Sequence, residues 1–121
     1  TSNQLLFRER YIELFDTEPD LFADAVYDGV YLIALAMEQA GTTLATAVAG
    51  QLRAVSAGGT VVNVGEFARG VELVRQGDEI DYEGASGSID FDAFGDVSSA
   101  TYRIWKVENG QFVDLETVTV P

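Results

Sequence analysis

The sequence predicts an α/β fold in which helices come first and strands last. Apolar residues recur at helical spacing as far as about residue 76, and after residue 78 they alternate with polar residues. Near the end, Asn109-Gly110 joins two β-rich runs, which is a strong hairpin signal. Because a two-stranded hairpin is marginal alone, this order predicts either that the hairpin packs on the helices as a small α+β unit or that its natural sheet partners are missing.

Four helices are expected, at about residues 5–15, 19–40, 44–56 and 66–76. Pro19 suits the first turn of the second helix, with Thr17 or Glu18 in the capping position. Gly41 suits the C-terminal end of the same helix. The body of this helix is apolar nearly all round, and the positions that we expect in the core are Val30, Ile33 and Met37.

Strand signals begin after the third helix, which the paired Gly58 and Gly59 should end. The run "TVVNV" is rich in β-forming residues, and "IDYEG" and "SIDFD" show the alternation of half-buried strands. An antiparallel hairpin is predicted with Asn109-Gly110 as a two-residue type I′ turn, and its strands are expected at about 100–108 and 111–119.

The composition is that of one modest, acidic domain. The chain has 121 residues, of which 47% are hydrophobic, and a formal net charge of -13. Such a surface repels phosphate backbones and anionic lipid heads, so we expect no nucleic-acid partner, and it suits a high-salt source. The absence of cysteine and histidine excludes disulfides, thiolate nucleophiles, His general bases and zinc sites of the usual ligand set. The start "TSNQLLFRER" lacks Met, which favours a fragment of a longer protein.

Motifs with catalytic or metal-binding chemistry are weak. The stretch "DFDAFGD" at residues 90–96 has oxygen ligands and a glycine at calcium-loop spacing, but Phe94 and Thr101 stand where further ligands are needed. We interpret it as a polar turn. Carboxylate pairs are unavoidable in a chain with 20 Asp and Glu, so a hydrolase is the weakest hypothesis. We expect no enzyme activity, cofactor or metal.

The start of the second helix is the candidate site. An apolar helix opens with Asp24, Tyr27 and Asp28, which are costly to bury without partners. The first turns could line a wet cleft while the helix body is core. The alternative is an ordinary helix N-terminus, where acidic side chains are favourable.

Four stretches of the sequence resemble a known family: "FRERY", "EPDLFADAVYDGVYLIALAMEQAG", "YEGASGSIDFDAFGD" and "YRIWKVENGQFV". In this order they resemble the C-terminal third of a type I periplasmic solute-binding protein. The most similar group is the branched-chain amino acid (Leu/Ile/Val) receptors of ABC importers. The trio Tyr27-Asp28-Gly29 departs from that group in having Gly where Ala is more frequent.

The resemblance implies a two-lobed Venus-flytrap α/β fold that closes over a ligand. Residues 1–121 would be a single fragment, with about 1–57 forming the helical part of one lobe and about 88–121 forming strands that reach the other lobe. Tyr27 and Asp28 would be the ligand-binding residues. Tyr27 is expected to face the cleft, whereas Asp28 is expected to cap or orient its neighbours more than to touch ligand.

The implied function is extracytoplasmic recognition of a solute, a branched-chain or other amino acid, for an ABC importer. The partners would be that small molecule and the importer's membrane permease, and the fragment could self-associate. Most groups that hold the amino acid's carboxylate and ammonium lie upstream of this segment in the family. The alternative function is a small free-standing acidic interaction or structural domain with no ligand.

Overall fold

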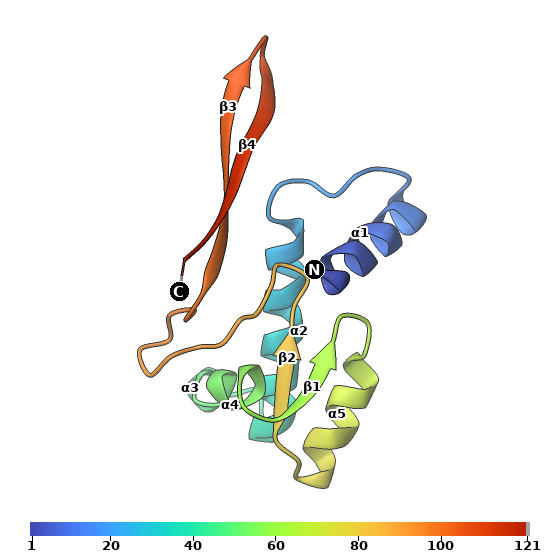
Figure 1. Cartoon of the computed structure of the whole chain (residues 1–121). Helices are drawn as coiled ribbons and strands as arrows, with labels where there is room; N and C mark the ends of the chain where they lie inside the picture. The colour runs from blue at the N-terminus through green and yellow to red at the C-terminus, as the bar shows by residue number, and fades with distance from the viewer. Residues whose placement is uncertain (121) are drawn as a thin grey trace.

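The computed structural model describes residues 1–120, in which a long hairpin projects from a body of helices and two parallel strands (Figure 1). This confirms the mixed α/β class and the antiparallel strand pair at the C-terminal end. None of the helices in these residues has the length and apolarity that crossing a membrane requires. The elements, in chain order, are α1 (Ser2–Phe15), α2 (Ala23–Ala40), α3 (Ala45–Ala49), α4 (Leu52–Ser56), β1 (Thr60–Asn63), α5 (Phe67–Gln76), β2 (Ile80–Glu83), β3 (Ala100–Glu108) and β4 (Gln111–Val120).

Strands β1 and β2 pair in parallel, with Thr60 opposite Ile80 and Asn63 opposite Glu83. Parallel strands need a crossover connection, and α5 supplies it. This pairing was not predicted, although both runs had strand-like composition. The core lies where α2, α4 and α5 cover this small sheet, and its most deeply buried apolar side chains are Leu35, Val55, Val62, Ile80 and Tyr82.

The predicted core face of α2 was wrong. Val30 is 62% exposed and Ile33 is 51% exposed, while Met37 is only half-buried. The buried residues of the helix body are instead Leu32, Leu35 and Ala36. Because α2 is apolar around most of its circumference, periodicity alone could not select the face that packs on the sheet.

The predicted start of α2 was also wrong. The helix begins at Ala23, and the residue before it, Phe22, has a positive φ of 68°. Pro19 therefore lies outside the helix. Glu18, one of the two expected caps, instead accepts a hydrogen bond of 2.8 Å from Arg8 Nε on α1. Glu18 therefore forms an ion pair with α1 and does not cap α2.

Two further boundaries differ from the prediction. The expected helix at 44–56 is two short helices, α3 and α4, separated at Gly50 and Gln51. The stretch 88–92 forms only isolated bridges, between Ser88 and Glu83 and between Phe91 and Val97. Helix α5 matches its prediction closely, and Phe67 and Val71 on its expected face are packed against the core.

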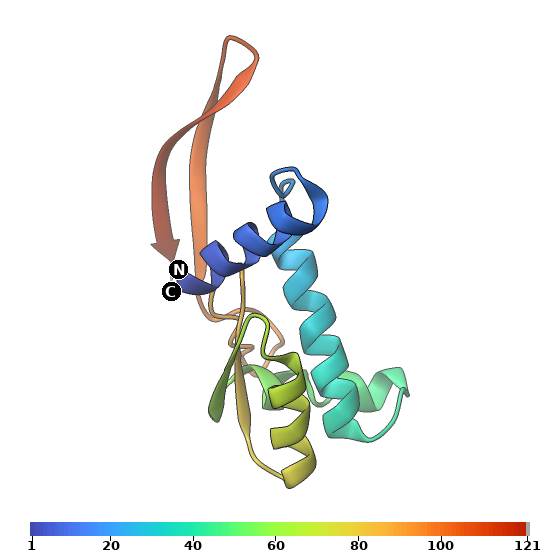
Figure 2. The same cartoon turned by 90° about the vertical axis from the view of Figure 1, so that its right-hand side faces the viewer.

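Strands β3 and β4 form the expected hairpin, with Glu108 opposite Gln111 across the turn. Asn109 and Gly110 have φ values of 53° and 75°, the two positive values that a type I′ turn requires. Residues 101–120 are all exposed, and Figures 1 and 2 show the strands extending away from the helices. Packing of the hairpin on the helices, the first of the two predicted alternatives, is therefore wrong.

Candidate functional site

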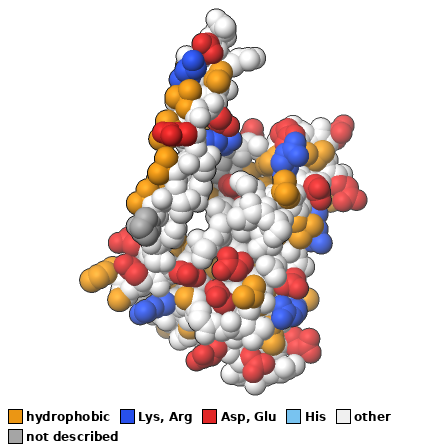
Figure 3. All heavy atoms as spheres, in the orientation of Figure 1, with side chains coloured by type: hydrophobic (Ala, Val, Ile, Leu, Met, Phe, Trp, Pro, Cys, Tyr) orange, Lys and Arg blue, Asp and Glu red, His pale blue; other side chains and the backbone are white. Residues whose placement is uncertain are grey.

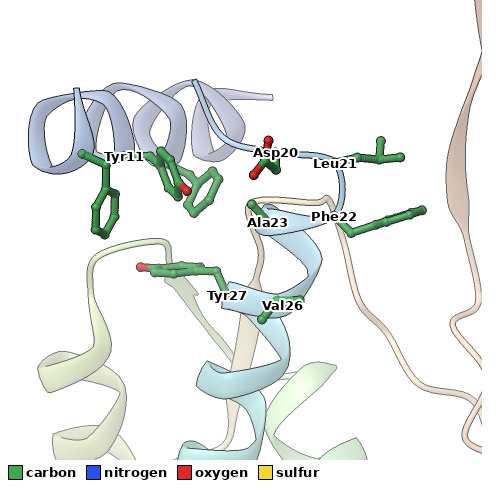
Figure 4. A pocket seen from close by; sticks show the side chains of 9 residues that line it. Tyr11, Asp20, Leu21, Phe22, Ala23, Val26 and Tyr27 are labelled. Atoms are coloured by element: carbon green, nitrogen blue, oxygen red, sulfur yellow. The ribbon is translucent and has the colours of Figure 1, made fainter. Parts of the chain in front are cut away.

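Tyr27 lies in a shallow hollow between α1 and the start of α2. The hollow measures about 440 Å³, and its walls are mainly aromatic and aliphatic (Figure 4). Tyr27 itself is half-buried, which confirms the prediction of a partly exposed aromatic on a concave surface. The residues that line the hollow are Phe7, Tyr11, Phe15, Asp20, Leu21, Phe22, Ala23, Val26 and Tyr27.

The ring of Tyr27 belongs to a chain of aromatic contacts that runs from α1 into the core. Its centroid lies 5.1 Å from that of Phe7 on α1 and 4.5 Å from that of Tyr31, one turn along α2. Tyr31 in turn contacts Tyr82 of β2 at 5.3 Å and Phe67 of α5 at 5.2 Å. These tilted and edge-on contacts are the arrangement that aromatic rings prefer, so the position of Tyr27 is well determined.

The hydroxyl of Tyr27 faces the loop that joins β1 and α5 (Figure 4). Burial raises the pKa of this phenol above its usual value, and Tyr31 adds to the increase. The Gly65 backbone N–H and the charge of Arg10 lower the same pKa by smaller amounts. Tyr27 is therefore a neutral hydroxyl at physiological pH, able both to donate and to accept a hydrogen bond.

Asp28 is 1% exposed, and its carboxylate is fully occupied by donors from the β2 end. Oδ1 accepts hydrogen bonds from Tyr82 Oη and Ala85 N, each at 2.8 Å. Oδ2 accepts from Ser86 N at 2.8 Å and from Ser86 Oγ at 2.6 Å. Gly84 leaves the space for this carboxylate, because a Cβ there would lie 2.5 Å from Oδ2.

These contacts agree with the expectation that Asp28 orients its neighbours. The carboxylate ties the first turns of α2 to the loop 84–87, and so it holds the helix turn that carries Tyr27. Burial and the adjacent Asp28 charge together raise the pKa of Tyr82, which keeps its hydroxyl a donor. Direct contact of Tyr27 or Asp28 with a solute stays a prediction.

The Tyr27 hydroxyl, on one side of the hollow, lies beside Gly65, just beyond the carboxyl end of β1. In α/β sheets this edge is where ligands usually bind, because the loops there present backbone groups and short polar side chains. Asn3 of α1 closes the edge by donating to Asn63 Oδ1 at 3.1 Å and to the Glu83 carbonyl at 2.8 Å. Asn3, Arg10 and Gly65 were not predicted as site residues from the sequence, because only the parallel pairing of β1 and β2 brings them to this edge.

Three carboxylates that could hold a metal ion meet on the β2 side of the body. Oxygens of Asp81, Glu83 and Asp90 lie within 4.8 Å of one another. Burial raises the pKa of Asp81 and of Glu83, and repulsion from the neighbouring carboxylates adds to both increases. Oxygen ligands of this kind suit a hard divalent cation. The sequence suggested Asp90 as a metal ligand only within the rejected calcium loop, without Asp81 or Glu83.

The "DFDAFGD" stretch is a turn closed by its own hydrogen bonds. Asp92 Oδ1 accepts from Phe94 N at 2.7 Å and from Asp96 N at 3.0 Å. The Asp92 N–H also donates to the Asp96 carbonyl at 2.8 Å. The interpretation as a polar turn is confirmed, because its central carboxylate serves the loop's own backbone.

Comparison with known proteins gives the site its context. Residues 7–110 match the receptor family ligand binding region. Over 73 residues, or 60% of this chain, the sequence is 38% identical to the chemotactic signal transduction system substrate-binding protein BasB of Halobacterium salinarum. The chain spans 18% of the length of that relative. No solved structure matches the chain significantly.

The family match covers Tyr27, Asp28, both parallel strands and the first hairpin strand, β3, with its turn. The predicted resemblance to ligand-binding receptors is confirmed at this level, and the family and the relative are binding proteins, not enzymes. The chain belongs to the family defined by the receptor ligand-binding region.

Proposed function

We propose that the chain forms one wall of a solute-binding site in an extracytoplasmic substrate-binding protein. The observation that carries this proposal is the half-exposed ring of Tyr27 in an aromatic hollow, at the ligand edge of the parallel strands. Family membership supports it, because the family's shared region binds ligands. Residues up to about 57 belong to one lobe in this proposal, and those from about 88 reach toward the other.

The solute in this proposal is an amino acid with an aliphatic side chain. Tyr11, Phe15 and Tyr27 offer apolar surface that suits a leucine-sized or valine-sized group. A wall of this kind contacts its ligand from one side only, so the contacts must offset the translational freedom that is lost on binding, roughly 4 kcal/mol or more. We therefore expect the chain by itself to bind free leucine no more tightly than about millimolar.

Titration of the chain with leucine, followed by NMR, tests the proposal. We expect the ring signals of Tyr27 and Phe7 to shift saturably, because both rings line the hollow. Tyr27→Ala should abolish the shift of the Phe7 ring signal. The matched control Tyr102→Ala should leave this shift unchanged, since Tyr102 lies 58% exposed on β3. Shifts that survive in Tyr27→Ala, or no shift at tens of millimolar leucine, would favour the alternative of an acidic domain without a ligand.

The proposed partner on the membrane is the permease of an ABC importer, which would place the protein on the outer side of the cell membrane. A second candidate is a signal transducer for chemotaxis, because the Halobacterium salinarum relative is a substrate-binding protein of a chemotactic signal transduction system. Deletion of the gene separates the two. Loss of solute uptake with normal chemotaxis supports import, and loss of the chemotactic response with normal uptake supports signalling.

A further inference from the structure

Arg10 differs from most basic side chains of this chain in having no acidic partner. The chain has seven Lys and Arg against 20 Asp and Glu, so partners are abundant. Among residues 1–120, Arg10 and Arg53 make no ion pair and no side-chain hydrogen bond. Backbone hydrogen bonds are the main cause that lowers the pKa of Asp92, and the nearby charge of Arg53 adds a smaller effect. The five basic residues that do form ion pairs are Arg8, Arg69, Arg75, Arg103 and Lys106.

The guanidinium of Arg10 lies directly over Gly65, just beyond the carboxyl end of β1. A Cβ built on Gly65 would meet the guanidinium, with Cζ only 2.9 Å away. Gly65 also has a positive φ of 83°, which L side chains rarely adopt. The positive φ favours glycine at this position, and the absence of a Cβ lets the guanidinium approach closely.

Two further polar groups face the same corner. The Gly65 N–H has no backbone acceptor among the described residues and donates instead to the Tyr27 hydroxyl, and Gly65 is exposed. The Tyr27 hydroxyl is directed toward the same loop (Figure 4). Arg10 lies one helical turn after Phe7, so its side chain leaves α1 on the side that borders the aromatic hollow. A guanidinium and a phenol that the Gly65 N–H holds thus lie together beside an apolar wall.

We propose that the Arg10 guanidinium and the Tyr27 hydroxyl, which the Gly65 N–H holds in place, form an anion-binding corner that takes the carboxylate of the solute. An arginine presents its donors in a planar fork that matches a carboxylate, and these charge-assisted hydrogen bonds are stronger than neutral ones. The aliphatic part of the same solute lies against Tyr11 and Phe15. This inference rests on the proposed function and adds the group that recognises the charged end of the ligand.

The test is an NMR titration of the chain with three probes of equal carbon skeleton: isovalerate, isovaleramide and isoamylamine, at constant ionic strength and neutral pH. We expect isovalerate to shift the Gly65 amide and the Arg10 side-chain N–H signals saturably. Isovaleramide should bind at least about tenfold more weakly, because it lacks the charge that the guanidinium recognises. Equal binding of the amide and the carboxylate would overturn the proposal.

Arg10→Gln is the decisive variant, and Arg53→Gln is its matched control. Both arginines are exposed and unpaired, so both variants should keep the wild-type helical circular dichroism. Arg10→Gln should weaken isovalerate binding about tenfold or more, whereas Arg53→Gln should leave it unchanged. Arg10→Lys should recover only part of the affinity, because an ammonium keeps the charge without the planar fork. Equal weakening by Arg53→Gln would indicate a nonspecific charge effect and overturn the proposal.

The titration also separates this inference from the function on which it rests. If the Tyr27 and Phe7 rings shift with all three probes while Gly65 does not, the apolar wall stands and the anion-binding corner is wrong. If no probe shifts the Tyr27 ring, the proposed solute site itself is wrong, and the anion-binding corner fails with it.

Discussion

At the scale of single residues, Asp28 shows how a charge can be buried at a helix start. An isolated carboxylate in the interior is very costly, but here both oxygens accept hydrogen bonds. All the donors come from Tyr82 and the two residues that follow Gly84, more than fifty positions along the chain. Asp28 is thus the polar link between α2 and the carboxyl end of β2.

Replacing Asp28 tests this link. Asp28→Ala leaves the Tyr82 hydroxyl and the Ala85 N–H without their acceptor, and we expect a loss of about 3 kcal/mol or more in the free energy of unfolding. Ser86→Ala removes only one hydroxyl donor and should cost about 1 kcal/mol. Urea unfolding followed by helical circular dichroism measures both. Equal losses for the two variants would contradict the role given to Asp28.

The pH dependence of stability should reveal Asp81. Burial and the nearby Asp90 raise the pKa of Asp81 above its ordinary value of 3.8. The folded state therefore binds more protons than the unfolded state between these two pKa values, and stability falls as the pH rises through that interval. Asp81→Asn should be more stable than the wild type at neutral pH, with the difference vanishing below pH 3.8. Thermal unfolding across this range at low salt checks the result, and a difference that is independent of pH would refute it.

At the scale of elements, two glycines near Asp28 have opposite roles. Gly84 is buried, and any Cβ there would lie 2.6 Å from the Asp28 carboxyl carbon, so the loop after β2 depends on glycine. Gly29, inside α2, has no atom within 4 Å of an added Cβ. The helix therefore has room for the alanine that is more frequent at this position in the resembled receptors.

These glycines give a matched pair of substitutions. We expect Gly84→Ala to destabilise the body by about 2 kcal/mol or more, because backbone and carboxylate must move apart. Gly29→Ala should stabilise it by roughly 0.5–1 kcal/mol, because alanine has the higher helix propensity. Chemical denaturation of the two variants beside the wild type decides the point. A stabilising Gly84→Ala would show that the Asp28 contacts are looser than described.

The hairpin is an element whose stability is local. Its register is held by the turn at Asn109-Gly110 and by side-chain contacts across the strands, such as the diagonal contact of Trp105 and Phe112, whose rings meet edge to face at 4.5 Å. Gly110→Ala places a side chain at a φ of 75° and should lower the hairpin population, while Asn109→Gly should preserve it. Cross-strand NMR contacts and Trp105 fluorescence report the change. Helical circular dichroism should stay constant, and a parallel loss of helix would contradict the separation of hairpin and body.

At the scale of the whole molecule, exposed apolar surface and acidic charge have opposite effects on self-association. Val26, Val30 and Ile33 form an exposed stripe along α2, with exposures of 66%, 62% and 51%. Figure 3 shows hydrophobic side chains along the hairpin as well, and acidic side chains over much of the body. Exposed apolar surface favours association, whereas a net charge of -13 opposes it.

We therefore expect self-association that increases with salt, because screening weakens the repulsion between acidic surfaces. Light scattering of the chain at low and high salt measures this. Val30→Ser combined with Ile33→Ser should reduce association at high salt, because both side chains lie on the exposed stripe. A matched control, Leu115→Ser on the exposed β4 strand, separates the helix stripe from the hairpin. Association unaffected by the helix variant and abolished by the control would assign the contact to the hairpin instead.

The sequence by itself determined the features that depend on neighbouring residues. The helix at 66–76 follows from apolar spacing within a single element, and the turn at Asn109-Gly110 follows from two residues that tolerate positive φ. The half-exposed place of Tyr27 was also predicted, because the motif around it carries a family resemblance.

Only the tertiary structure decided which surfaces meet. It selected the buried face of α2 and brought Arg10 over Gly65. It also supplied Asp28 with hydrogen-bond donors that are distant from it along the chain. The physical reason is that burial and hydrogen bonding are settled between segments distant in the chain. An apolar helix that could bury several faces, or a carboxylate that could accept from many donors, carries no local signal of the partner it finds.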